Sequence, residues 1–224
     1  MKTKPSALYA ALHYLSYRSR TRSEMEAYLT RKQYPANEIH EAMSKLKTYG
    51  YIDDEDYVRR VSDGVHQHPT KGRNSLPGKL IRKGISQELV MQTLENYDET
   101  ADEAKAFRFG HQQMMNSLSQ PWRKCVDSLY RKLISRGFTS DVIQQVIQRL
   151  ASDTELQSAR EAAEDEQFQQ ALATAEKTFL RWQHQEPSRS KLRQRMLQSL
   201  YQRGYEGEMA HRAVEASMKT HDTD

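Results

Sequence analysis

Apolar residues recur at the same spacing in four places along the chain. Counted from a turn residue, they stand eight and four positions before it and one, six and ten positions after it. The turn residues are Gln33, Gly84, Gly137 and Gly204. The apolar residues around them are Met25, Leu29, Tyr34, Ile39 and Met43; Leu76, Leu80, Ile85, Val90 and Leu94; Leu129, Leu133, Phe138, Ile143 and Ile147; and Met196, Leu200, Tyr205, Ala210 and Val214. Such self-similarity indicates an array of similar structural units.

Each motif predicts two short amphipathic helices joined at the turn residue, because positions four apart share one helix face. Glycine suits the turn, since it adopts the left-handed conformation that ends many helices without a steric penalty. Gln33 departs from this pattern and would lose on the order of 1 kcal/mol in that conformation, so we expect a looser first turn. Ser86 and Thr139 are expected to cap the following helices, and Pro35 to occupy a first helical turn.

Helical segments also precede these helix pairs, at residues 5–17, 53–65 and 99–115, so each unit is expected to contain three helices. The first segment places Leu8, Leu12 and Leu15 on one face. Successive turn residues lie 51, 53 and 67 positions apart. The last excess is close to four helical turns, so the acidic stretch 153–183 is expected to lengthen the first helix of the last unit.

The sequence therefore predicts an all-α protein of tandem three-helix, helix-turn-helix-like repeats, stacked into an elongated, curved array. The predicted repeats are residues 1–50, 51–98, 99–151 and 152–224, the last with a lengthened acidic first helix. One such unit cannot bury its apolar face alone, whereas stacked units share a core between neighbours. Elongated arrays of this kind are commonly binding surfaces.

Charge is unevenly distributed along the 224 residues, although the net charge is only +4. The first 94 residues are net positive and residues 95–170 are net negative. A basic half can attract polyanions or an acidic protein face, although solvated helix surfaces explain it equally well. The single Cys125 excludes an intramolecular disulfide and a cysteine metal cluster. No apolar run approaches the roughly 20 residues needed to cross a bilayer, so we expect a cytoplasmic protein without membrane contact.

The residue before each turn is basic, at Lys32, Lys83, Arg136 and Arg203. A cation in the last helical turn stabilises the helix dipole, and this explanation needs no partner. Our alternative hypothesis is a basic ribbon that binds a phosphate backbone or an acidic groove. Its candidate residues are Arg31, Lys32, Lys71, Arg73, Lys79, Arg82, Lys83, Arg131, Lys132 and Arg136.

Other classes of function find less support in the sequence. Acidic groups in the first turn of each second helix disfavour sequence-specific DNA recognition there. No phosphate-binding glycine loop, HExxH motif or nucleophile elbow is present, so we expect no enzyme activity, no catalytic residue and no cofactor. We also expect no metal site at the acidic run 53–56 or at His66 and His68. Cys125, Trp122 and Trp182 are interpreted as packing residues.

Several motifs occur in the order typical of one known family. They are ALHYLSYRSRTRSEMEAYLTRKQY (11–34), GYIDDEDYVRRVSDG (50–64), KGRNSLPGKLIRKGISQELVMQTL (71–94) and LYRKLISRGFTSDVIQQVI (129–147). Together they resemble the RecX regulatory protein family, whose pattern has an Ile-Asp-Asp helix start followed by a Leu-x-x-Lys-Gly-Ile helix pair. The resemblance covers nearly the whole chain and is weakest in the last 70 residues.

The resemblance implies an all-helical repeat protein without catalytic residues. It implies binding to the RecA recombinase filament on single-stranded DNA, inhibition of its ATPase and strand exchange, and thereby modulation of recombinational DNA repair and the SOS response. Weak binding to single- or double-stranded DNA and a monomeric state are also expected. Two alternatives stay open, a DNA-binding module without sequence specificity and a general helical scaffold for another protein.

Overall fold

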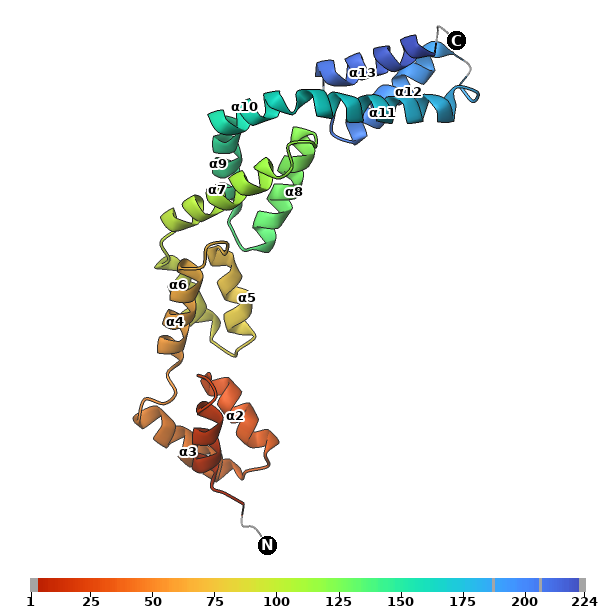
Figure 1. The fold of residues 1–224 in the computed structure, drawn as a ribbon. Helices are drawn as coiled ribbons and strands as arrows, with labels where there is room; N and C mark the ends of the chain where they lie inside the picture. The colour runs from red at the N-terminus through yellow and green to blue at the C-terminus, as the bar shows by residue number, and fades with distance from the viewer. Residues whose placement is uncertain (1–3, 187, 206, 222–224) are drawn as a thin grey trace. The chain divides into compact units, whose positions relative to one another are not determined.

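The computed structural model describes residues 4–186, 188–205 and 207–221. Within these ranges every regular element is helical, as the sequence predicts (Figure 1). The helices are α1 (Ala7–Leu15), α2 (Arg22–Arg31), α3 (Ala36–Thr48), α4 (Asp54–His66), η1 (Arg73–Ser75), α5 (Leu76–Ile81), α6 (Gln87–Glu95), α7 (Thr100–Met115), α8 (Trp122–Ser135), α9 (Ser140–Ala151), α10 (Thr154–Ala162), α11 (Glu164–Trp182), α12 (Arg189–Gln202) and α13 (Gly207–Thr220).

The four repeated motifs form four helix pairs, which we call the first to fourth hairpins. They are α2 with α3, α5 with α6, α8 with α9, and α12 with α13. The all-α tandem-repeat class is thus confirmed, whereas the repeat boundaries at residues 50, 98 and 151 stay a proposal.

The chain forms two compact units. One contains the residues up to Lys105 together with Arg136–Thr139, and the other contains Ala106–Ser135 and the residues from Ser140 onward. The turn of the third hairpin therefore belongs to the first unit, although the two helices that it joins belong to the second.

The turn residues adopt the predicted left-handed conformation, with φ of 58° at Gln33, 76° at Gly84, 84° at Gly137 and 90° at Gly204. The expectation of a looser first turn is wrong. At Gln33, Gly84 and Gly204, the amide of the turn residue bonds three residues back and the next amide bonds five residues back, as in a Schellman helix ending. Two such hydrogen bonds hold Gln33 in a conformation that its side chain alone disfavours.

The predicted apolar positions form the cores of the hairpins. All eight residues at four and eight positions before the turns are buried, and so are the four residues directly after them. Three of the later positions, Ile39, Leu94 and Ile147, are only half-buried. The predicted stripe on α1 is confirmed for Leu8 and Leu15, which are half-buried against the core, but not for Leu12, which is exposed. The fully buried residues of α1 are instead Ala7, Ala10 and Ala11. Small side chains on this face let α1 pack closely against α3.

The acidic stretch before the fourth hairpin is two helices, not one lengthened helix as predicted. The chain turns at Ala163 between α10 and α11, where the Ala163 amide bonds back to Ala159 and Arg160. Acidic residues then occupy the first turn of α11, where they favour a new helix start. Figure 1 shows α11 beside α12 and α13, and these three helices share one hydrophobic core.

The capping geometry of α3 and α6 can be compared with the predicted helix starts. Ser86 caps α6 as expected, since its hydroxyl accepts a hydrogen bond from the amide of Leu89. Pro35 stands just before the first turn of α3, at the cap position, and makes no side-chain capping bond.

Candidate partner-binding surface

The turn of the second hairpin docks on the start of α2 in the first. Thr21 caps α2 and is fully buried, and its hydroxyl donates a hydrogen bond of 2.5 Å to the Lys83 carbonyl. The Lys83 ammonium lies 2.5 Å from a Glu24 carboxylate oxygen. Lys83, which sequence analysis assigned to the basic ribbon, is therefore half-buried and engaged in joining two hairpins.

Glu24 is electrostatically adapted to this contact. Its partial burial opposes ionisation, but hydrogen bonds from Lys83, Arg18 and the Thr21 amide outweigh that effect, and the pKa of the Glu24 carboxyl lies below its ordinary value. The carboxylate is consequently charged and paired at neutral pH.

The turn of the third hairpin makes an equivalent contact with the second. The amide of Gly72 donates to the Arg136 carbonyl at 3.1 Å, and the amide of Asn74 donates to the Gly137 carbonyl at 2.8 Å. A Cβ placed on Gly137 would lie 2.9 Å from Ser75 Cα. At the fourth hairpin, a Cβ on Gly204 would touch Pro121 at an ordinary 3.4 Å.

A second predicted ribbon residue, Arg73, lies beside a buried charged network. Its amide donates to Asp102 at 2.9 Å and its guanidinium pairs with Glu99. Asp102 pairs with Lys105 at 2.5 Å, and both side chains are at least 95% buried. Burial, followed by the Asp102 carboxylate beside it, raises the pKa of the Tyr97 hydroxyl well above its ordinary value. Arg73 is therefore largely committed to the fold.

Cations of the third hairpin differ in accessibility. Lys132 is half-buried and donates to the Gln113 side chain at 2.6 Å. Arg131 is exposed and donates to the Asp127 carbonyl of its own helix. Arg136 is half-exposed, and its carbonyl is held by the Gly72 amide.

Five predicted ribbon residues remain open to solvent in the first compact unit. They are Arg31, Lys32, Lys71, Lys79 and Arg82, and none forms an ion pair with a described residue. A polyanion or an acidic protein can reach these five cations, as it can the exposed Arg131 of the third hairpin. We call the five the open cations.

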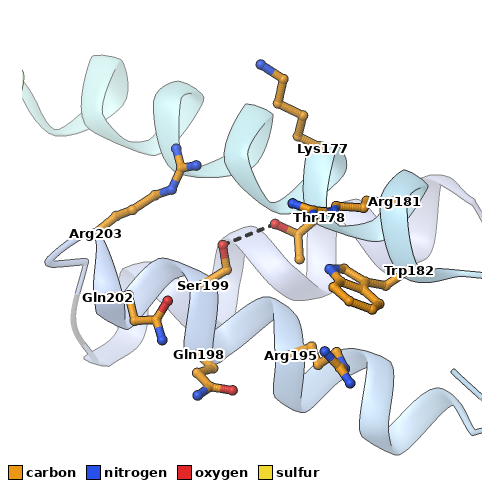
Figure 2. A pocket seen from close by; sticks show the side chains of 9 residues that line it. All are labelled: Lys177, Thr178, Arg181, Trp182, Arg195, Gln198, Ser199, Gln202 and Arg203. Atoms are coloured by element: carbon orange, nitrogen blue, oxygen red, sulfur yellow. Dashed lines mark hydrogen bonds between the residues drawn. The ribbon is translucent and has the colours of Figure 1, made fainter. Parts of the chain in front are cut away.

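Sequence reasoning missed a polar pocket of about 360 Å³ between α11 and α12. Its lining includes Lys177 and Arg181 from α11, Arg195 from α12, and Arg203 directly after α12. In Figure 2 the Lys177 side chain extends away from the other lining residues. Trp182 lines one end, and Thr178 donates to Ser199 across the pocket at 3.2 Å. Cations four and eight positions apart on neighbouring helices were the sequence signal that could have revealed it.

One cluster of side chains could hold a metal ion, and sequence reasoning missed it as well. His111 of α7 places Nε2 3.5 Å from Asp153 and 3.4 Å from Glu155, both at the start of α10. A protonated His111 would form two ion pairs in the same geometry. Within the described ranges no other group of three such residues lies this close together, and none includes His66 or His68.

Helices of the described part of the chain are all too short or too polar to cross a membrane. Cys125 is a buried free thiol, and Trp122 and Trp182 are half-buried beneath the guanidinium groups of Arg160 and Arg195.

Two family models match the chain, that of the RecX first three-helix domain at residues 7–46 and that of the RecX third three-helix domain at residues 164–214. The first match spans most of α1 to α3, and the second begins at α11 and ends within α13. The last three-helix segment is thus recognised where the motif resemblance was weakest.

Whole-chain relatives point to the same family. The regulatory protein RecX of Oceanobacillus iheyensis is 23% identical over 97% of this chain and 76% of its own length. That of Staphylococcus carnosus is 28% identical over 89% of this chain and 71% of its own length. That of Bacillus cytotoxicus is 30% identical over 70% of this chain and 58% of its own length.

Solved structures agree with these relatives. The crystal structure of RecX from Lactobacillus salivarius matches with a TM-score of 0.60 and 26% identity, covering 65% of this chain and 94% of that one. A further RecX crystal structure, at 24% identity and a TM-score of 0.56, supports the fold. With both domain models, the relatives and the helical repeats in agreement, the chain belongs to the RecX regulatory protein family.

Proposed function

We propose that this protein binds the RecA recombinase filament on single-stranded DNA and inhibits its ATPase and strand-exchange activities. In the cell this action would modulate recombinational DNA repair and the SOS response from the cytoplasm, without any catalytic step of its own. Membership of the RecX regulatory family is the observation that carries this proposal.

The open cations suggest how the filament is contacted. Arg31, Lys32, Lys71, Lys79 and Arg82 are exposed and lack ion pairs with described residues, so their charge is available to an acidic protein groove or to DNA phosphates. The pairing of Lys83 with Glu24 removes that residue from our list of contacts.

A direct test measures single-stranded-DNA-dependent ATP hydrolysis by RecA while this protein is titrated to well below one copy per recombinase. We expect strong inhibition at low ratios. Unchanged hydrolysis, with the protein shown folded by circular dichroism, would reject the proposal and leave a helical scaffold for another protein as the better explanation.

Substitutions of the open cations test whether they contact the filament. Lys71→Gln, Lys79→Gln and Arg82→Gln together should weaken inhibition and reduce its dependence on salt. The matched control replaces Arg22, Lys45 and Arg59 by Gln, because these cations are exposed in the same unit but pair with Glu26, Glu41 and Asp56. Equal inhibition by both triple variants would place the contact elsewhere.

A DNA-binding module that acts without a recombinase is the second candidate, favoured by the same open cations. Titrating the protein alone with single- and double-stranded DNA at several salt concentrations separates the two functions. Tight DNA binding without any effect on RecA would support this second candidate.

A further inference from the structure

The pocket between α11 and α12 has the composition of an anion-binding groove. Four cations line it, and no carboxylate does (Figure 2). One of the four cations, Arg195, is paired with a carboxylate outside the lining, the nearly buried Glu186. The other three, Lys177, Arg181 and Arg203, form no ion pair with a described residue. The groove therefore carries an excess of positive charge.

Trp182 organises the cations at one end of this groove. The Arg195 guanidinium lies over the indole ring at 4.1 Å, and that of Arg181 lies at 5.4 Å. Stacking on an aromatic ring and pairing with Glu186 restrict the rotation of Arg195. Its remaining N–H donors are thereby held in a defined direction, which lowers the entropy lost when they bind an oxyanion.

Cation spacing favours an extended anion over a single small one. Lys177 and Arg181 are neighbours on one face of α11, about 5–6 Å apart at Cβ. Arg203, which directly follows α12, lies about two helical turns beyond Arg195. One phosphate would not reach all four positions, whereas consecutive phosphates of one strand can meet them in turn.

The remaining lining is polar and favours a nucleic acid strand over an acidic peptide. Thr178, Gln198, Ser199 and Gln202 supply hydroxyl and amide groups, which bind phosphate oxygens well. Protein partners need an apolar centre to their contact, and this groove offers only Trp182. The volume of about 360 Å³ admits the backbone of one strand.

We propose that the α11–α12 groove binds the phosphodiester backbone of single-stranded nucleic acid, with Arg181, Arg195 and Arg203 contacting phosphates and Trp182 positioning the guanidinium groups. This site is separate from the open cations and needs no recombinase. If the groove did not bind a strand, the proposal that the protein inhibits RecA would still stand. If the protein did not inhibit RecA, the proposal for the groove would still stand.

The chain offers an internal reporter for the test. It contains two tryptophans, so a Trp122→Phe variant of the full-length protein leaves Trp182 as the sole source of indole fluorescence. We would titrate this variant with a short oligothymidylate, with inorganic phosphate, and with polyglutamate of matched charge, at several salt concentrations and without RecA.

We expect saturable quenching or enhancement of Trp182 emission by the oligothymidylate, with at least tenfold weaker binding of inorganic phosphate and of polyglutamate. Adding Arg181→Gln and Arg203→Gln should weaken oligothymidylate binding at least tenfold. The slope of log affinity against log salt should also fall by about 0.7 for each lost phosphate contact.

Arg193→Gln is the matched control, because Arg193 lies on the same helix but pairs with Glu215 of α13. It should leave the affinity within about twofold, as expected when no phosphate contact is lost. Circular dichroism of all variants establishes that they are folded. Oligothymidylate binding that leaves Trp182 emission unchanged, or that survives the double substitution, would overturn the proposal. Equal binding of polyglutamate would reassign the groove to acidic protein segments, and equal binding of phosphate to small anions.

Discussion

The hydroxyl of Thr21 donates to the carbonyl of Lys83, 62 residues further along the chain, at 2.5 Å. The same oxygen accepts the Glu24 amide of its own helix at 3.2 Å. One buried hydroxyl thus satisfies a free amide in the first turn of α2 and also holds the turn of the next hairpin. The second hairpin is therefore fastened to the first at the point where α2 begins, and not only through its apolar face.

Thr21→Val should destabilise the protein by about 2 kcal/mol, because it removes a helix cap and leaves a buried carbonyl without its partner. Urea unfolding followed by circular dichroism measures this change. Ser188→Ala is the control, since Ser188 caps α12 in an exposed position with one partner only. Its expected cost is about 1 kcal/mol. Equal losses in both variants would mean that the bond to Lys83 adds nothing.

Gly137→Ala should be more damaging than Gly50→Ala, although both glycines have positive φ. An alanine in this conformation costs about 1–2 kcal/mol at either position. At Gly50 the added Cβ meets nothing within 4 Å, whereas at Gly137 it collides with the backbone of Ser75. Urea unfolding of the two variants gives the difference. Similar stabilities would show that the third turn is not pressed against the second hairpin.

Asp102→Ala should destabilise the protein by about 3–5 kcal/mol, because it leaves the buried Lys105 ammonium without its counter-ion. Lys105 also donates to the carbonyls of His66 and Lys71, so its displacement would loosen the segment before η1. Tyr97→Phe removes the hydrogen bond that the hydroxyl donates to Asp102 and the longer one that it accepts from Lys105, but leaves the ion pair in place, and should cost about 1–3 kcal/mol. Thermal and urea unfolding rank the two variants. A smaller loss of stability in Asp102→Ala than in Tyr97→Phe would contradict a stabilising role of the buried Asp102–Lys105 pair.

Stability should fall in acid partly through Glu24. Its pKa in the folded protein lies below the ordinary value of 4.5. The unfolded chain therefore takes up a proton first, and the stabilisation from Glu24 is complete above pH 4.5 and lost as the pH falls through the folded-state pKa. Glu24→Gln should flatten the pH dependence of unfolding in this range. If stability depended on pH equally in the variant and in the unmodified protein, the pairing of Glu24 with Lys83 would be excluded as a source of acid sensitivity.

Cys125 should react slowly with thiol reagents in the native protein. It is buried, and burial raises the pKa of its thiol, although Lys124 and Arg160 act in the opposite direction. A raised pKa lowers the thiolate fraction at neutral pH, and the thiolate is the reactive form. Labelling with a chromogenic disulfide should be slow in buffer and fast in urea. Rapid labelling in buffer would show that α8 opens readily.

Sequence periodicity predicted the parts of the fold that depend on neighbours in the chain. The four hairpins, the left-handed turn residues and the Ser86 cap all rest on spacings of ten residues or fewer. On α1 periodicity identified Leu8 and Leu15 but missed the three fully buried alanines, because it ranks side chains by size. Close approach of α1 to α3 instead selected alanines, and that preference depends on a partner helix. The break at Ala163 lacks a glycine or proline to mark it.

The candidate site was less predictable than the fold. Local sequence identified the cations near the turns but could not distinguish Lys83, which pairs with a residue 59 positions away, from the exposed Arg82 next to it. The α11–α12 groove depends on how two helices pack. In the sequence Lys177 and Arg181 lie within the acidic stretch 153–183, and Arg195 and Arg203 lie beyond it, so nothing local indicated that they meet.

Gln33 shows that the hairpins are not interchangeable modules. Every turn residue must accept a left-handed backbone, but Gly84 and Gly137 must in addition leave room for the helix start that faces them. Gln33 meets the first demand only, and its carbonyl and that of Lys32 are bound instead by the Lys4 ammonium. A hairpin carrying glutamine at its turn could therefore not be moved to an interior place in the series. The side chain at this one position determines the order in which such modules can be joined, a rule that any lengthened or shuffled array would have to respect.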